Sequence, residues 1–214
     1  MPTGIALHDA RDQLFGAAER VLLRDGPNAL TSRAVTTEAG CAKGVLHRHF
    51  ADFDTFLAEL VRDRIARLGS QAADLRDSAG TGTVAGNVTA ALMDLFESVA
   101  VAIVGLVTSR HELLARLRET TLRGVPLLTE ASAMVASYLA AERDLGRISA
   151  DADIDTLAPT LIGAGHLLFA GGATTPTDAD AVHKVVATVI TGVVVNRDGA
   201  PRPGASRRSS RRTE

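Results

Sequence analysis

The segment from residue 42 to residue 49 carries basic and imidazole side chains at a spacing that suits contact with nucleic acid. Lys43 and Arg48 can donate hydrogen bonds to phosphate oxygens and to the acceptor edges of bases. Leu46 and Phe50 are four residues apart, so on a helix they share one face and leave the polar side chains turned outward. A short helix of this kind, braced by a second helix, is the geometry of a helix-turn-helix entering a DNA major groove.

The residues before this segment are suited to position it. Thr31 can cap a first helix, because its hydroxyl can accept a free backbone N–H of the first turn. Gly40 stands where that helix must end, in a left-handed conformation that favours glycine. The second helix is expected to open at Ala42–Lys43, after Cys41. The sequence therefore predicts two short helices joined by a tight turn within residues 31–50.

This stretch resembles the DNA-binding signature of the tetracycline-repressor (TetR) family of one-component transcriptional regulators. The resemblance covers about the first quarter of the chain and rests on Ala17, Ala18, Leu22, Gly26, Thr31, Val35, Ala39, Gly40, Gly44, Leu46, His49 and Phe50. It implies an all-α protein, with an N-terminal three-helix helix-turn-helix domain followed by a larger helical domain for ligand binding and dimerisation. It also implies a repressor that binds a palindromic double-stranded DNA operator as a homodimer and is released by a small-molecule effector.

Carried over position by position, the resemblance implies DNA contacts from both helices of the pair. Ser32 and Arg33 match positions that touch the DNA backbone or bases, and Lys43 matches the start of the recognition helix. The candidate DNA-binding residues are Ser32, Arg33, Ala42, Lys43, Gly44, Val45, His47, Arg48 and His49.

Three positions depart from the family pattern. His47 replaces the usual tyrosine, and its imidazole can still donate to a phosphate oxygen. Ala42 replaces the usual serine, so the recognition helix lacks a side-chain cap, a loss of about 1 kcal/mol. Phe53 stands where the family commonly has a lysine that clamps a phosphate. These departures leave an alternative open, a degenerate relative that binds a small molecule or a protein and has weak DNA affinity.

The composition is consistent with a helical, DNA-binding regulator. Of 214 residues, 46% are hydrophobic and only 3% are aromatic, which favours an aliphatic helical core and argues against binding single-stranded nucleic acid by ring stacking. The single cysteine, Cys41, excludes an internal disulfide and suits a reducing compartment. The N-terminus has no signal-peptide pattern, and the longest apolar run, Val99–Val107, is too short to span a bilayer. We therefore expect a cytoplasmic protein that does not enter the membrane.

The net charge of −2 is unevenly distributed. Residues 1–52 hold six basic and six acidic side chains, residues 53–196 hold eleven and seventeen, and residues 197–214 hold six and two. The acidic excess therefore lies away from the DNA-reading helices. Electrostatic affinity is expected to be modest for one subunit, so a dimer would be needed to sum two sets of phosphate contacts.

Hydrophobic periodicity and capping residues predict helices through most of the chain. A capping box of Ser109 and Glu112 is expected to open one of them. The expected elements are Asp9–Asp25, the pair within 31–50, a helix from Phe53 to the break at 78–82, Thr83–Val107, Arg110 to about Leu122, Leu127–Leu145, Asp155–Phe169 and Asp178 to about Val195. The expected domains are 1–52 for DNA binding, 53–196 for ligand binding and dimerisation, and a disordered Arg/Ser-rich tail, 197–214.

The resemblance implies that the last two long helices dimerise and that the larger domain encloses an effector pocket. Small residues on those helices, Gly163, Ala164, Gly165 and Gly192, would permit close helix approach in an interface or in an internal core. Large or adaptable side chains on converging helices suggest a mostly apolar, medium-sized ligand. The candidate ligand-binding residues are Met93, Phe96, His111, Met134, Tyr138, His166 and Phe169.

Other functional sites are disfavoured by the pattern. His47 and His49 are two residues apart and point to different sides of a helix, so no metal site is expected with Cys41. Glycines at 80 and 82 follow a predicted helix rather than a strand, so no dinucleotide cofactor is expected. An all-helical enzyme is a weak alternative, because the acids of the larger domain lie mostly on polar faces or at helix ends.

Overall fold

The protein was analysed as a computed structural model, which describes residues 4–119, 124–170 and 177–195. The described elements are α1 (Gly4–Asp25), a 3-10 turn (Pro27–Ala29), α2 (Ser32–Glu38), α3 (Gly44–His49), α4 (Phe53–Asp77), α5 (Val84–Phe96), α6 (Ala100–Ser109), α7 (His111–Arg118), α8 (Leu128–Asp144), α9 (Ile154–Ala170) and α10 (Ala179–Ile190). The fold is all-α, and the only extended pairing within these ranges is one bridge, Ile148 with Val194. The predicted tail, 197–214, lies outside the described residues.

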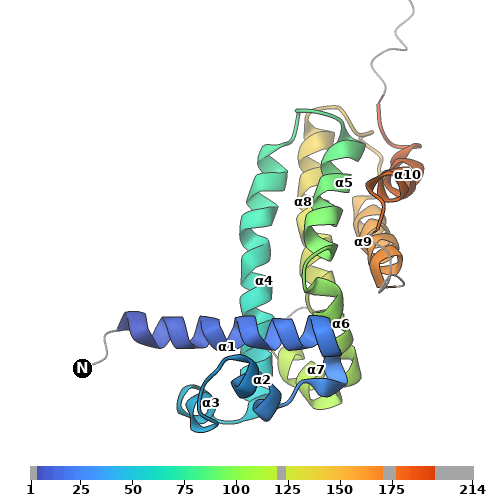
Figure 1. Ribbon diagram of the computed structural model, residues 1–214. Helices are drawn as coiled ribbons and strands as arrows, with labels where there is room; N and C mark the ends of the chain where they lie inside the picture. The colour runs from blue at the N-terminus through green and yellow to red at the C-terminus, as the bar shows by residue number, and fades with distance from the viewer. Residues whose placement is uncertain (1–3, 120–123, 171–176, 196–214) are drawn as a thin grey trace, which may run out of the picture.

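The N-terminal helices form a small head at one end of the molecule. Helix α1 crosses the start of α4, and α2 and α3 lie on the outer side of that crossing (Figure 1). An aromatic cluster holds the crossing together: the ring centroid of Phe15 lies 5.8 Å from Phe50 and 5.6 Å from Phe56, and those two lie 5.0 Å apart edge to face. All three rings are nearly fully buried, so a few aromatic residues supply the rigid centre of the head.

The C-terminal helices form a bundle along the rest of α4. Helices α4, α5 and α8 run side by side, and α9 and α10 cover the outer side of α5 and α8 (Figure 1). Asp52 starts α4 as its N-cap, with its Oδ1 accepting the N–H of Thr55 at 2.6 Å. Gly146, at φ +69°, ends the segment after α8, as glycine commonly does beyond a helix C-terminus.

The expected continuous helix Thr83–Val107 is wrong. Helix α5 ends at Phe96, α6 begins at Ala100, and the two axes differ by 60°. Ser98 competes with the helical pattern at the break, because its hydroxyl donates to Leu95 O and accepts from Ala100 N. The bend lets α6 leave the bundle and pack against the 3-10 turn of the head.

Two other expectations about helix ends are also corrected. Ser109 is the last residue of α6 and donates to Leu106 O, so it forms no capping box with Glu112, and α7 begins at His111 without a side-chain cap. Helix α10 ends at Ile190 rather than near Val195. The chain turns over 191–193 and then extends, with Val194 bridging Ile148 and Val195 N donating to Arg147 O at 2.9 Å.

Within the described ranges, no single helix is long and apolar enough to cross a membrane. Only α5 and α6 counted together reach the length and apolarity of a span, across their 60° bend.

Two glycines on α9 provide a matched test of the packing. A Cβ at Gly165 would lie 2.9 Å from Cε2 of Phe96, whereas a Cβ at Gly163 would meet no atom within 4 Å. Gly163→Ala should therefore raise the free energy of unfolding by up to about 1 kcal/mol through helix propensity. Gly165→Ala should lower it, because overpacking costs about 1–3 kcal/mol. Urea unfolding at one protein concentration measures both, and shifts of the same sign would contradict the packing of α9 on Phe96.

Candidate DNA-binding interface and ligand pocket

The turn between α2 and α3 has the geometry of a helix-turn-helix. Thr31 caps α2, with its hydroxyl accepting from Ala34 N at 3.1 Å. Gly40 adopts φ +64° after the helix, and the N–H of Cys41 donates to Thr36 O at 3.0 Å. These bonds satisfy backbone N–H and C=O groups that would otherwise be unpaired at the two ends of α2, and they direct the chain into α3. The expected positions of the cap and of the glycine turn are thus found in the structure.

Helix α3 presents one face to the head and the other to solvent. Leu46 and Phe50 are buried against the head, with 0% and 3% of their surface exposed. Of the nine candidate DNA-binding residues, Arg33, Ala42, Lys43, Gly44, His47 and Arg48 are exposed, and Ser32, Val45 and His49 are half-buried. Lys43 precedes the helix without a side-chain cap, as expected from the alanine at position 42.

The charges of the head divide into paired and unpaired sets. Arg20 and Arg24 each donate to Glu38 at 2.8 Å, and the bond from Arg20 chiefly holds the pKa of Glu38 below its usual value. Within the described residues, Arg33, Lys43 and Arg48 have no ion-pair partner. The cations left unpaired therefore lie on or beside α2 and α3. The hydroxyl oxygen of Ser32 is also buried without a hydrogen-bond partner among the described groups.

Phe53, where a lysine is common in the family pattern, packs inward. Its ring stacks on Phe56 with centroids 5.6 Å apart, and the guanidinium of Arg110 lies 5.9 Å from the ring centroid of Phe53. The neighbouring Asp52 is engaged in capping α4, and this backbone bond chiefly lowers its pKa. Arg116 of α7 lies 3.7 Å from Asp52, so a cation from the helical domain approaches this point.

Among the described residues, the candidate ligand-binding side chains lie in different places. Phe96, His166 and Phe169 come together between α5 and α9, with the Phe96 ring 5.9 Å from the His166 ring and 5.6 Å from the Phe169 ring. Burial in this cluster lowers the pKa of His166. Met134 instead lines a cavity of about 210 Å³ between α4, α5 and α8.

The other three candidates lie apart from both groups or have structural contacts. Met93 is half-buried on α5. His111 is exposed and lies beside Asp54 in a shallow cavity near the head. Tyr138 is fully buried and its hydroxyl donates to Glu142 at 2.6 Å, which is a role in packing the bundle.

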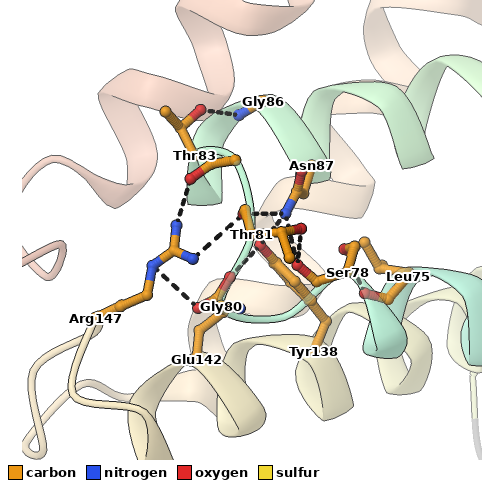
Figure 2. Close-up of polar contacts among 11 residues, drawn as sticks. Leu75, Ser78, Gly80, Thr81, Thr83, Gly86, Asn87, Tyr138, Glu142 and Arg147 are labelled. Atoms are coloured by element: carbon orange, nitrogen blue, oxygen red, sulfur yellow. Dashed lines mark hydrogen bonds and ion pairs between the residues drawn. The ribbon is translucent and has the colours of Figure 1, made fainter.

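A buried polar network around Glu142 was not identified from the sequence (Figure 2). Glu142 is fully buried, accepts a bond from Gly80 N at 3.3 Å and lies 3.3 Å from the Nε of Arg147. The same arginine donates to Gly82 O at 2.8 Å. Burial and the bond to Glu142 raise the pKa of Tyr138. The i,i+4 spacing of Tyr138 and Glu142 was the available signal, but the sequence did not indicate that this helix face is buried.

Within the described part of the chain, no three His, Cys, Asp or Glu side chains lie close enough to hold a metal ion. Cys41 is half-buried and packs against the hydrophobic core.

The comparisons with known proteins agree on the head and on the fold. A family model described as bacterial regulatory proteins, tetR family, matches residues 14–60, which include all of α2 and α3. No curated protein sequence matches the chain significantly.

Solved structures of low sequence identity share the whole fold. A putative TetR-family transcriptional regulator from Mesorhizobium loti is 13% identical, with a TM-score of 0.64 over 88% of this chain and 98% of that one. Reduced NemR from Escherichia coli is 14% identical, with a TM-score of 0.69 over 87% and 98%. FadR from Bacillus subtilis, solved with stearoyl-CoA, is 16% identical, with a TM-score of 0.65 over 85% and 98%.

Three observations agree. Helices α2 and α3 have helix-turn-helix geometry, the family model matches the head, and the remaining helices share the fold of solved regulators. The match of the head to a family of DNA-binding regulators favours a regulatory role over the alternative of an all-helical enzyme. Residues 14–60 of the chain match the tetR family of bacterial regulatory proteins, and its described helices share the fold of solved TetR-family regulators.

Proposed function

We propose that the protein is a repressor that binds a palindromic operator as a homodimer and leaves it when a small apolar or amphipathic molecule binds. The observation that carries this proposal is the exposed face of α3, which presents Lys43, His47 and Arg48 beside a buried Leu46. Such a face can contact base edges and phosphates in the major groove. A cytoplasmic location accompanies this role.

Phosphate contacts would come from α2 and from the turn. The unpaired guanidinium of Arg33 lies exposed at the start of α2, where backbone N–H groups also favour an anion. With few cations on each head, two heads are needed for useful affinity at physiological salt. Recognition helices of a dimer commonly lie about 34–36 Å apart, one turn of the duplex.

The outer side of α9 and α10 is the proposed dimer face. Leu167 is 75% exposed there, and Gly163 leaves open space beside the helix. Gly165 instead faces Phe96 within the subunit, so it belongs to internal packing. A partner helix covering Leu167 would remove a large apolar side chain from water, which favours association.

Effector release requires a ligand that prefers the DNA-free conformation. FadR from Bacillus subtilis holds stearoyl-CoA in the same fold, which supports an amphipathic effector for this chain. A 100-fold loss of operator affinity needs about 2.7 kcal/mol of coupling between the two sites.

A second candidate function is favoured by Phe53. Because this ring packs on Phe56 and no lysine stands at its position, phosphate affinity is reduced relative to the family pattern. A protein that uses this fold only to bind a ligand or another protein would give no specific mobility shift with the DNA that flanks its own gene. A repressor would give such a shift.

Lys43→Ala tests the recognition helix. Loss of a base-contacting cation should weaken specific binding by about 1–3 kcal/mol and relax base preference at its position. Footprinting and mobility-shift titration at fixed salt measure both effects. Arg76→Ala is the control, because Arg76 is exposed at the end of α4 far from the head. An unchanged footprint with Lys43→Ala would mean that α3 is not the reading helix.

Phe53→Lys tests the missing phosphate clamp. The added cation should raise affinity and steepen the dependence of log affinity on log salt by about one unit. Phe53→Met separates the added charge from the lost ring packing on Phe56, because methionine is of similar length and uncharged. If Phe53→Lys and Phe53→Met give the same salt slope, the start of α4 does not approach the DNA.

A further inference from the structure

A second cavity, of about 260 Å³, lies where α4, the α5–α6 bend and the start of α8 meet. Its apolar wall is formed by Leu68, Leu95, Val99, Ile103 and Leu127, none of which is more than 6% exposed. The volume is just below the range of roughly 300–1,000 Å³ that holds drug-sized ligands. The cavity therefore suits one short apolar chain or ring.

The lining of this cavity also includes polar and basic side chains. Arg64, Arg67 and Gln71 line it from α4, whereas no acidic residue of the described chain does, although Arg67 also pairs with Asp63 at 3.0 Å. Ser70 and Ser98 add hydroxyl groups. An apolar wall beside guanidinium groups matches a ligand with an apolar body and an anionic head, because a guanidinium binds carboxylate and phosphate oxygens well.

Arg64 also joins the cavity to the DNA-binding head. Its Nε and Nη2 both contact one carboxylate oxygen, Oε1, of Glu19 on α1. The side chains are 21% and 14% exposed, so this ion pair is largely shielded from water. A guanidinium carries five N–H donors, so contact with a single oxygen leaves donors for a second anion.

Backbone strain is found in the same wall. Leu127 has φ +74°, the only non-glycine residue with a positive φ in the described ranges, and it is 3% exposed. Its N–H donates to Glu130 Oε2 at 2.7 Å, which helps to hold the conformation. Residues held in such conformations are concentrated at ligand clamps and switch regions.

We infer that this cavity binds a small amphipathic anion, whose head is held by Arg64 and Arg67 and whose apolar part lies against the leucine-rich wall. The anion and Glu19 then share the positive charge of Arg64, which weakens the Arg64–Glu19 ion pair and loosens α1 from α4. That this loosening lowers operator affinity rests on the proposed function, whereas the binding itself does not.

Ligands that share one chain and differ in head charge test the cavity on the wild-type protein without DNA. Octanoate and octyl phosphate should both bind, as measured by calorimetry and by a rise in Tm, at least tenfold more tightly than octan-1-ol. Octylammonium should bind more weakly than the alcohol. Octanoate binding no tighter than octan-1-ol would overturn the proposal, and a response to only one of the two anions would identify which head group fits.

Charge variants test the named residues. Arg64→Gln should weaken octanoate binding about tenfold, the size expected for one charge-assisted bond, and leave octan-1-ol binding unchanged. Glu19→Gln should strengthen octanoate binding several-fold, because the competing carboxylate is lost. Glu59→Gln is the matched control: it removes another ion pair between α1 and α4, that of Glu59 with Arg11, and Glu59 does not line the cavity. Equal effects of Glu19→Gln and Glu59→Gln would overturn the competition.

The effect on DNA is measured separately. Octanoate should lower operator affinity in the wild type and should do so less in Glu19→Gln, where the ion pair is already absent. If octanoate binds as expected and the operator complex is unaffected, the proposed release mechanism fails while the ligand site stands.

Discussion

Helix α4 runs through both the head and the bundle and contributes to the one hydrophobic core that joins them, and this shared helix is the constraint on which the rest of the structure depends. Near its start, Phe56 packs with Phe15 and Phe50 in the head. Further along, Leu68 and Leu75 face cavities between α4 and the C-terminal helices. A helix of 25 residues is about 37 Å long. Because it is one rigid element, a displacement of α4 within the bundle reaches the DNA-reading helices.

The contacts between head and bundle differ in kind from those inside the head. The head is centred on aromatic rings with centroids 5.0–5.8 Å apart, and such a packed cluster moves as a unit. The junction combines apolar packing of α6 on the 3-10 turn with polar bonds that include Arg11 to Glu59, Arg64 to Glu19, Arg110 to Leu30 O at 2.9 Å, and Arg116 to Thr55 Oγ1 at 2.8 Å. A partly exposed ion pair such as Arg11 with Glu59 contributes little, about 0–1 kcal/mol. The exposed polar contacts of the junction can therefore open at small cost.

Sequence reasoning succeeded where the signal is local. The N-cap threonine, the glycine turn and the apolar pair Leu46 and Phe50 act within a few residues of one another, so α2 and α3 were predictable. The break after Phe96 was missed because a serine inside an apolar run does not by itself indicate a bend. The candidate ligand residues were dispersed for a different reason: composition identifies large side chains, but their convergence depends on how the helices are rotated against one another. The Glu142 network and the arginine-lined cavity also depend on how the helices are rotated against one another, which the sequence does not show.

The far end of α4 is anchored in the bundle by a buried polar network, whereas some of the polar contacts between head and bundle are partly exposed. Beyond the far end of α4, Gly80 binds the fully buried Glu142, and Asn87 donates to Ser78 O at 3.2 Å and to the Tyr138 hydroxyl at 3.0 Å (Figure 2). Breaking a buried ionic network costs about 3–5 kcal/mol, more than opening a partly exposed ion pair. On the proposed function, a ligand bound between the head and this network would disturb the exposed polar contacts of the junction first. Movement would then be expected at the head rather than at α8.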